Sequence, residues 1–543
     1  MEDNNKLVEK ADIVIISNCI FDGINDNLKD GILAIKGNKI LGIYKRDLLQ
    51  DLISDNTKVY VYENKLVMPG FHDSHIHMAI GSLFTDETYC AELGNVHSLE
   101  ECMNVLVEFG NKYKTNEIVV GGGFNNLNIP GGTSPDKNLI DNYIKDRPVI
   151  IMNWSFHTIY ANTLAIKLSG ILDIPGINGI ERDKNGEPTG EFNDSAAFEM
   201  QDYATRVSKE QKKSSMKKLL HKMNMSGITS ASEVFPSGRS DPYSIWKEIE
   251  TDEELTARLT FYPPLLGYKK EEIEEYRNKY NSGMLLFSGL KALMDGVIIP
   301  HTAWMHEPYA NAPHTSGEPA VDPDYMKNEI LRAHSEGINV RIHTIGDKAV
   351  TYVLDCFEEA NKKYGSIARR HCMEHVNYIK EMDYPRFKEL GVAISTHPTA
   401  LENYMTPDNP MLKILGEDRC KRTWPVKSFL DNGAIVGTGT DFSVVPFDPM
   451  LTMHAMCARC GKDGWPEGGW NPDQKISIYQ ALSIYTYGSA AVVNREKELG
   501  TLDKGKYADI TVLDKNITKV SYDKLVGTKA MLTIVNGKVV YEQ

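Results

Sequence analysis

The sequence predicts an α/β fold, with a TIM-type barrel in the middle of the chain and a small β domain built from both chain ends. Helix-then-strand units repeat between Pro69 and about Gly488, a pattern typical of βα architectures. Short strand-like segments stand at both ends of the 543 residues, a length that predicts two or three domains. No GxGxxG motif follows an early strand, which argues against a nucleotide-binding doubly wound sheet.

The two chain ends have the same β-rich character. Hairpin signals stand at Lys36-Gly37-Asn38-Lys39 near the start and at Asn536-Gly537 near the end. We therefore expect the two ends to pair in one small sheet domain, with the rest of the chain inserted within it. The expected strands cover residues 13–16, 32–35, 40–43, 508–513, 532–535 and 538–541.

The middle of the chain alternates helices with apolar strands. One unit has a helix from Asp324 to Gly337 and a strand over 338–343, and another has a helix at 426–430 and a strand at 434–441. This rhythm breaks over 113–210, where glycine-rich turns are frequent. We interpret that region as an insertion after the first barrel strand, close to the barrel mouth.

Composition limits the partners. Lys and Arg number 60 against 74 Asp and Glu, a net charge of −14 with no basic block, so nucleic acid and membrane partners are not expected. The polar N-terminus shows no signal peptide, and no apolar run is long enough for a transmembrane helix. We expect a cytoplasmic protein whose eight scattered cysteines are reduced thiols, although Cys457 and Cys460 form a CxxC pair of open role.

A His-x-His pair follows the apolar run that begins at Leu66. Residues i and i+2 of a strand point to the same face, so His75 and His77 can present both imidazoles to one point. Neutral imidazole is the commonest metal ligand in proteins. Taken alone, such a pair is more often an ordinary surface or core feature.

Four further polar residues stand where barrel strands are expected to end: Lys291, His343, His375 and Asp441. Catalytic residues of TIM barrels lie at such ends. Each has a structural alternative, because a single histidine is often only hydrogen-bonded and an aspartate often caps a helix. Lys291 is harder to explain structurally, since a lone buried ammonium is costly. Together with the His-x-His pair, these residues indicate a metal site.

The motifs as a set resemble the amidohydrolase superfamily, specifically its YtcJ-like branch, which includes N-substituted formamide deformylases. The resemblance covers nearly the whole chain. It rests on PGFHDSHIH, LKALMDG, HTIGD, MEHV, GTGTDFSVVPFDP and ELGTLDKGKYADITVLD.

The resemblance implies a distorted (β/α)8 barrel over 69–488, a β-sandwich domain from 1–68 and 489–543, and the insertion at 113–210. It also implies one or two divalent metal ions, usually zinc, and suggests a homodimer. In that scheme His75 and His77 bind the more buried ion, His343 and His375 bind the second, and a carboxylated Lys291 bridges them. Asp441 contacts the buried ion and acts as general base.

Three residues are weaker candidates for substrate contact. His157 matches a histidine of the family in the inserted region, although it is equally a loop histidine. His397 stands at the expected end of the seventh strand. Asp295 follows Lys291 closely and suits either orientation of neighbouring groups or a turn. His72, just before the His-x-His pair, has no assigned role.

These observations predict a metal-dependent hydrolase that cleaves a C–N bond of amide, N-acyl or N-formyl type in a small molecule through a metal-activated water. A deaminase or cyclic-amide hydrolase would use the same site. An alternative of another class is a non-catalytic barrel that acts as a binding protein, which the complete set of candidate ligands disfavours. The sequence does not identify the substrate.

Overall fold

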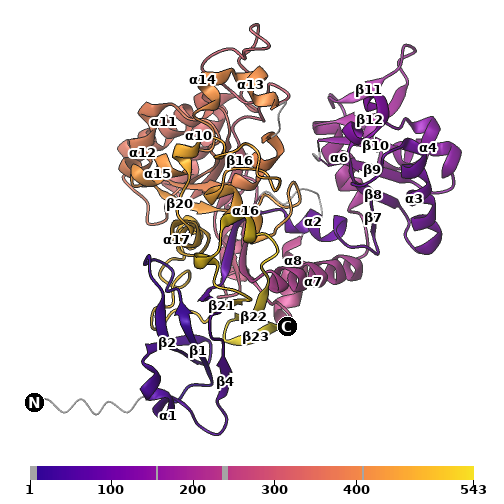
Figure 1. Cartoon of the computed structure of the whole chain (residues 1–543). Coiled ribbons are helices and arrows are strands. Elements are labelled where there is room, and N and C mark those ends of the chain that lie inside the picture. The colour runs from indigo at the N-terminus through magenta and orange to yellow at the C-terminus, as the bar shows by residue number, and fades with distance from the viewer. Residues whose placement is uncertain (1–8, 155–156, 235–241, 406–408) are drawn as a thin grey trace, which may run out of the picture.

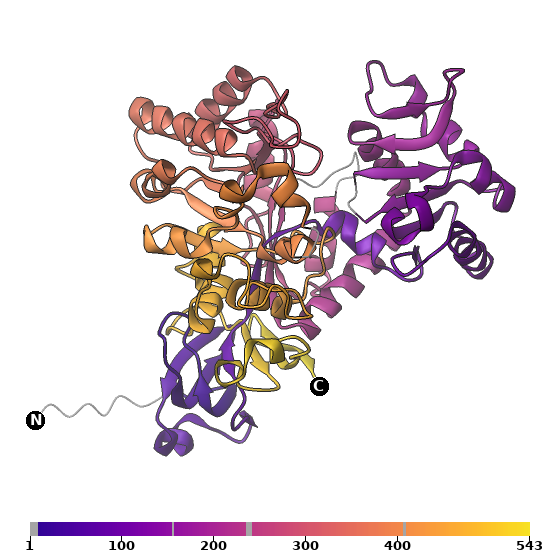
Figure 2. The same ribbon diagram turned by 45° about the horizontal axis from the view of Figure 1, so that its top comes forward.

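The computed structural model describes residues 9–154, 157–234, 242–405 and 409–543, and these residues form four β-sheets. Two parallel sheets lie in the middle, a sheet from both chain ends lies below them, and an inserted lobe lies to one side (Figure 1). The turned view shows the same separation of the inserted lobe (Figure 2). No helix among the described residues is long and apolar enough to cross a membrane.

The two central sheets contain only parallel strands, in the orders β15-β14-β13-β6 and β16-β17-β18-β19-β20. Nearly all their residues are buried, as in parallel sheets covered by helices. The strands are β6 (Phe71–Ile76), β13 (Ile228–Val234), β14 (Arg258–Tyr262), β15 (Leu285–Phe287), β16 (Leu290–Leu293), β17 (Val340–Thr344), β18 (Cys372–His375), β19 (Ala393–Thr396) and β20 (Ile435–Thr438).

Helices alternate with these strands, as the sequence predicts. The expected unit at 324–343 is a helix that ends at Ser335 followed by β17, and the unit at 426–441 is a helix that ends at Asp431 followed by β20. The helices are α7 (Lys209–Met225), α8 (Pro242–Thr251), α9 (Lys270–Lys279), α10 (Pro323–Ser335), α11 (Asp347–Tyr364), α12 (Tyr384–Leu390), α13 (Pro410–Leu415), α14 (Glu417–Cys420), α15 (Val426–Asp431), α16 (Pro449–Cys457), α17 (Ile478–Ser483) and α18 (Ser489–Val492).

Backbone hydrogen bonds join the two parallel sheets at a first seam, between the end of β14 and β16. The Lys291 N–H donates to the Pro263 carbonyl at 2.8 Å, and the Leu265 N–H donates to the Lys291 carbonyl at 2.7 Å. The backbone position of Lys291 is therefore fixed by strands on both of its sides.

A second seam joins β6 to the segment that follows β20. The Asp441 N–H donates to the His75 carbonyl at 2.9 Å, and the His77 N–H donates to the Phe442 carbonyl at 2.6 Å. Gly439 permits this approach, because a Cβ atom there would lie 2.4 Å from the His75 nitrogen. Three of the predicted site residues thus lie directly on a seam between the first and last parallel strands.

The chain ends form one eight-stranded sheet, in which β5 and β21 pair antiparallel and link the N-terminal strands to the C-terminal ones. Apolar side chains cover both faces, as separate clusters around Ile15 and Val14. The predicted terminal strands lie within or overlap its members: β1 (Ile13–Ile20), β2 (Lys29–Lys36), β3 (Lys39–Tyr44), β4 (Lys58–Val61), β5 (Val67–Pro69), β21 (Ile510–Leu513), β22 (Ala530–Val535) and β23 (Lys538–Glu542), with α1 (Leu49–Leu52) nearby.

The inserted lobe has its own six-stranded mixed sheet, in the order β11-β12-β10-β9-β8-β7. Its first strand begins at Cys90, and the amphipathic helix at 99–112, which precedes the expected insertion at 113–210, packs on this sheet. Its elements are β7 (Cys90–Glu92), β8 (Val119–Phe124), β9 (Val149–Asn153), β10 (Thr158–Ala161), β11 (Ile180–Arg182), β12 (Pro188–Asn193), α3 (Leu99–Lys112), α4 (Lys137–Tyr143), α5 (Thr163–Ser169) and α6 (Ser195–Ala204); α2 (Met78–Phe84) precedes them.

A buried histidine pair lies between α10 and β18. His371 Nδ1 accepts from the Val340 N–H at 3.0 Å, so its Nε2 carries the proton and donates to His334 Nδ1 at 2.9 Å. His334 Nε2 in turn donates to the Gly365 carbonyl at 2.7 Å. Burial lowers the pKa of His371 to about 3.

This pair predicts acid sensitivity. Because the folded pKa of His371 lies below its unfolded value of about 6.5, the unfolded chain binds more protons in that range, and stability falls as pH drops below about 6.5. Between pH 7 and pH 5 the loss from this residue is about 2 kcal/mol. His371→Asn keeps an acceptor for Val340 but does not titrate, so its free energy of unfolding should change less with pH by that amount.

Urea unfolding at pH 7 and pH 5 measures this difference. His221→Asn, a change at an exposed histidine, is the matched control and should keep the wild-type pH dependence. An unchanged pH dependence in His371→Asn would contradict the assignment.

Candidate metal centre

Three predicted ligands meet at the second seam. His75 is the second-last residue of β6, and His77 follows this strand directly. Asp441 lies three residues beyond the end of β20. Asp441 Oδ1 is 3.2 Å from His75 Nε2 and 3.0 Å from His77 Nε2. These three side chains lie close enough together to share one metal ion.

Glu374 determines which nitrogen of His75 is protonated. His75 Nδ1 lies 2.7 Å from Glu374 Oε2, and Glu374 is completely buried. Burial alone would raise the pKa of Glu374, but the cations of Arg341 and Lys291 hold it well below its usual range. The ionised carboxylate can only accept, so Nδ1 of His75 donates and Nε2 keeps its lone pair.

This tautomer leaves two electron-pair donors facing each other. Burial lowers the pKa of His75 to about 4, so its ring is neutral near pH 7. His77 Nε2 donates to Asp441 Oδ1 at 3.0 Å, a hydrogen bond that favours the ionised carboxylate. His75 Nε2 and Asp441 Oδ1 therefore meet at 3.2 Å without a proton between them, an arrangement that a bound cation stabilises.

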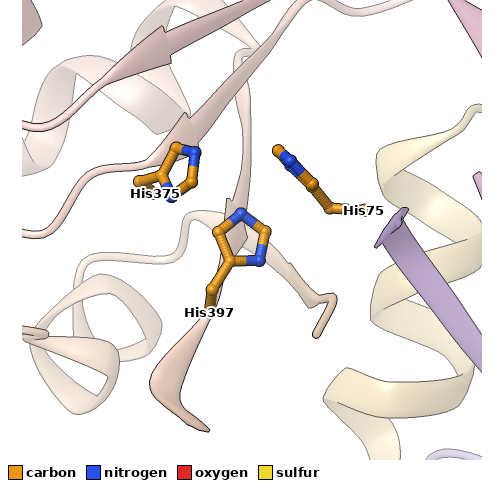
Figure 3. Close-up of side chains that lie close together, drawn as sticks. All are labelled: His75, His375 and His397. Atoms are coloured by element: carbon orange, nitrogen blue, oxygen red, sulfur yellow. The ribbon is translucent and has the colours of Figure 1, made fainter. Parts of the chain in front are cut away.

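A second group of possible ligands shares His75. His75, His375 and His397 are all buried and offer nitrogens that lie within 4.8 Å of one another. The ring centroids of His397 are 4.3 Å from His75 and 4.4 Å from His375. Figure 3 shows the three rings turned toward one another from separate parts of the chain.

Lys291 and His343 lie beside these groups. Lys291 Nζ is buried and has no hydrogen-bond partner among the described residues; burial lowers the pKa of Lys291 to about 8, although the Glu374 carboxylate opposes this shift. The His343 ring is 4.3 Å from that of His375, and its Nε2 donates to the Gly296 carbonyl at 3.2 Å, so Nδ1 keeps the lone pair. Burial lowers the pKa of His343 to about 3.

The Asp295 carboxylate is hydrogen-bonded to backbone N–H groups. Its carboxylate accepts from the N–H groups of Trp304 at 2.9 Å, Ile345 at 3.0 Å and Gly346 at 2.8 Å. The side chain is fully buried, and it ties the loop after β16 to the loop after β17, which carries His343. This bonding suits orientation of the site more than contact with a substrate.

His157 lies in the inserted lobe and outside both ligand groups. Its Nδ1 is 3.0 Å from Asp194 Oδ1, and its ring packs against Phe198 of α6. Figure 1 shows α6 on the side of the lobe that faces the parallel strands. A role of His157 in substrate contact remains a prediction.

Several charged residues at the centre were not anticipated. Asp73 accepts from the Thr440 hydroxyl at 2.6 Å and so ties β6 to the end of β20, while Glu233 Oε2 accepts from the Ala79 N–H at 2.9 Å just beyond His77. Burial raises the pKa of Glu233 to about 7. The available signal was a single Asp, Glu or Arg inside a buried strand that has no other such residue: Asp73, Glu233, Arg341 and Glu374. The remaining two expectations, His72 and the CxxC pair, lie outside both ligand groups.

Unusual backbone geometry helps to bring these groups together. His375 has φ of 68° and Asp441 has φ of 62°, values in the left-handed region that L-residues rarely adopt. Successive residues of a regular strand point to opposite faces, yet Glu374 and His375 both contact His75. The left-handed turn at His375 is what allows both side chains to face the same centre.

The chain is similar to known proteins over most of its length. The sequence pattern of the Amidohydrolase family matches residues 63–541, which is most of the chain. The chain belongs to the amidohydrolase family. Its relatives include Protein LONG AFTER FAR-RED 3 of Arabidopsis thaliana, 26% identical, with 98% of this chain and 92% of the relative aligned.

Two bacterial relatives and one solved structure are also similar to this family member. Putative amidohydrolase YtcJ of Bacillus subtilis is 26% identical over 95% of each chain. N-substituted formamide deformylase of Arthrobacter pascens is 24% identical, with 94% of this chain and 95% of the relative aligned. An uncharacterized metal-dependent hydrolase from Pyrococcus horikoshii OT3 superposes with a TM-score of 0.78 at 24% identity, covering 94% of this chain and 99% of the other, which shows a common fold.

The buried charge pair of Arg341 and Glu374 predicts a strong stability effect. Both side chains are fully buried, so Arg341→Met leaves the carboxylate without its main cation and should lower the free energy of unfolding by about 3–5 kcal/mol. Arg46→Met removes an exposed arginine that also pairs with a glutamate, Glu63, and should change the free energy of unfolding far less, because water screens this pair.

Denaturant unfolding of the two variants measures the contrast. The double variant Arg341→Met with Glu374→Gln removes the unpaired charge and should recover part of the loss. Equal effects of Arg341→Met and Arg46→Met would show that the buried pair is not important for stability.

Proposed function

We propose that this amidohydrolase-family protein is a metal-dependent hydrolase that cleaves a C–N bond of amide, N-acyl or N-formyl type in a small molecule. The observation that carries the proposal is the pair of facing donors, His75 Nε2 and Asp441 Oδ1, 3.2 Å apart in a buried site. Family membership supports hydrolytic chemistry. The name of one relative, a formamide deformylase, supports the bond type.

We further propose that the eight strands β6, β13, β14, β16, β17, β18, β19 and β20 form a distorted (β/α)8 barrel. The two seams support closure, because each joins the end of one parallel sheet to the other by backbone hydrogen bonds. In this proposal residues 69–488 contain the barrel, 1–68 and 489–543 form the β domain, and the lobe that includes 113–210 lies near the mouth.

The residues present fit a divalent metal, and we take zinc as the first choice. His75, His77 and Asp441 would hold one ion, and His343 and His375 would hold a second if two are bound. The unpartnered, buried Lys291 Nζ supports carboxylation, because its lowered pKa favours the neutral amine that reacts with carbon dioxide, and the product carries oxygen ligands. Histidine with carboxylate oxygen is a common donor set for zinc.

Asp441 is the proposed general base. A metal ion bound at this site lowers the pKa of water and polarises a carbonyl. Asp441, kept ionised by the hydrogen bond from His77, would accept the proton when water attacks and would return it to the leaving nitrogen. Asp295 and Glu374 hold His343 and His75 in orientation, so the ligands need little rearrangement.

Metal content of the purified chain, measured by elemental mass spectrometry, tests the proposal first. We expect one or two zinc-like ions per chain, and hydrolysis of at least one member of a panel of formamides and N-acyl amines. Release of a carboxylate and an amine distinguishes amide hydrolysis from a deaminase, which releases ammonia. Absence of metal, even after reconstitution with zinc, would contradict the proposal and favour the binding-protein alternative.

Asp441→Asn tests the general base directly. The amide cannot accept a proton, so kcat should fall by about 10²–10⁴-fold. Metal content should stay near the wild-type value, because His75 and His77 remain. Asp431→Asn, at an exposed helix position paired with Lys427, is the control and should leave kcat unchanged. Unchanged turnover in Asp441→Asn would exclude its role as base.

A further inference from the structure

His397 has a fixed protonation pattern that leaves one nitrogen open. It follows β19, and its side chain is 1% exposed. Its Nδ1 lies 3.1 Å from the Gly439 carbonyl oxygen. A carbonyl oxygen only accepts, so Nδ1 carries a proton and donates, and Nε2 is the ring nitrogen that can offer a lone pair.

This lone pair has no hydrogen-bond partner among the described residues. The acidic oxygen nearby, Glu374 Oε2, is 3.6 Å away, which is too long for a hydrogen bond. That oxygen already accepts from His75, and an ionised carboxylate has no proton to give. Leaving a buried acceptor unsatisfied is unfavourable, so a partner that accepts an electron pair would stabilise this arrangement.

The neighbours of His397 Nε2 supply the other donors of such a site. His75 and His375 offer nitrogens that lie, together with that of His397, within 4.8 Å of one another. In Figure 3 the three rings face a common space. Three imidazoles with an open fourth position are a donor set that catalytic zinc sites use.

We propose that His397 Nε2 is a metal ligand, in a group with His75 and His375, and that the Gly439 carbonyl holds its ring in the ligating tautomer. The inference rests on the proposed function, because it concerns a metal of the same centre. It adds a donor that the six expected ligands do not include. Because His75 keeps one lone pair, at Nε2, this ion is the one that Asp441 also faces, and in this arrangement His375 binds it instead of a second ion. Backbone carbonyls commonly hold metal-ligating histidines in this way.

His397→Asn isolates the proposed ligand atom. The asparagine amide nitrogen takes the place of ring Nδ1 and can still donate to Gly439, while no atom replaces Nε2. The dissociation constant for zinc, measured by competition with a chromophoric chelator, should rise by more than about 100-fold, above the effect typical of a residue that only orients a ligand. The cobalt-loaded protein should change its visible absorption spectrum, since the ligand set changes.

Two matched variants interpret the result. His375→Asn removes an expected ligand and calibrates the loss of one imidazole, while His221→Asn, at an exposed histidine, should keep the wild-type affinity and spectrum. If His397→Asn behaves like His221→Asn while His375→Asn loses metal, the inference is wrong and the proposed function stands. If the wild-type chain binds neither zinc nor cobalt, the proposed function itself fails.

A second measurement applies to the unaltered protein and covers the case in which His397→Asn does not fold. Anomalous scattering from crystals of the zinc-loaded wild-type chain locates the ion. A zinc peak about 2.1 Å from His397 Nε2 supports the inference. Ions placed only beyond about 3 Å from that nitrogen overturn it.

Discussion

The site depends on one constraint, which is that the first parallel strand must lie directly beside the segment after the last one. Two backbone hydrogen bonds make this contact, from Asp441 to His75 and from His77 to Phe442. The residues that form the seam include the candidate ligands His75, His77 and Asp441. The pairing that joins the two sheets therefore also brings these donors together. Gly439 makes it possible, because any side chain there would collide with His75.

Beside the histidines, the fully buried side chains of Arg341 and Glu374 form an ion pair, which is unusual inside a sheet. Arg341 pairs with Glu374 and also donates to the Ser74 carbonyl at 2.7 Å, so one guanidinium connects three strands. Glu374, held in place by Arg341, accepts a hydrogen bond from His75 Nδ1 and so fixes the orientation of the His75 ring. Such a buried ion pair contributes little to net stability compared with an apolar core, but it fixes tautomers and orientations that an apolar core would leave free.

Much of the order of helices and strands could be predicted from the sequence. Helix periodicity, glycines at helix C-termini and apolar strand segments are local signals. The paired chain ends and the units around His343 and Asp441 illustrate this. The packing of α3 on the sheet of the inserted lobe could not be predicted, since α3 has the same amphipathic pattern whichever sheet it covers. Of the site, the strand-end histidines could be predicted. The contacts of Glu374 with His75 and of His397 with Gly439 could not, because they depend on a left-handed turn at His375 and on a carbonyl distant in sequence.

The sheet made from both chain ends has a consequence for synthesis on the ribosome. Strands β1 to β5 leave the exit tunnel first, but β21, the partner of β5, follows some 440 residues later, on the order of 20–90 s at ordinary elongation rates. During that interval the edge of β5 that later pairs with β21 is open. The nascent chain therefore has a period in which chaperone binding or premature pairing competes with native folding, and it ends only when β21 emerges.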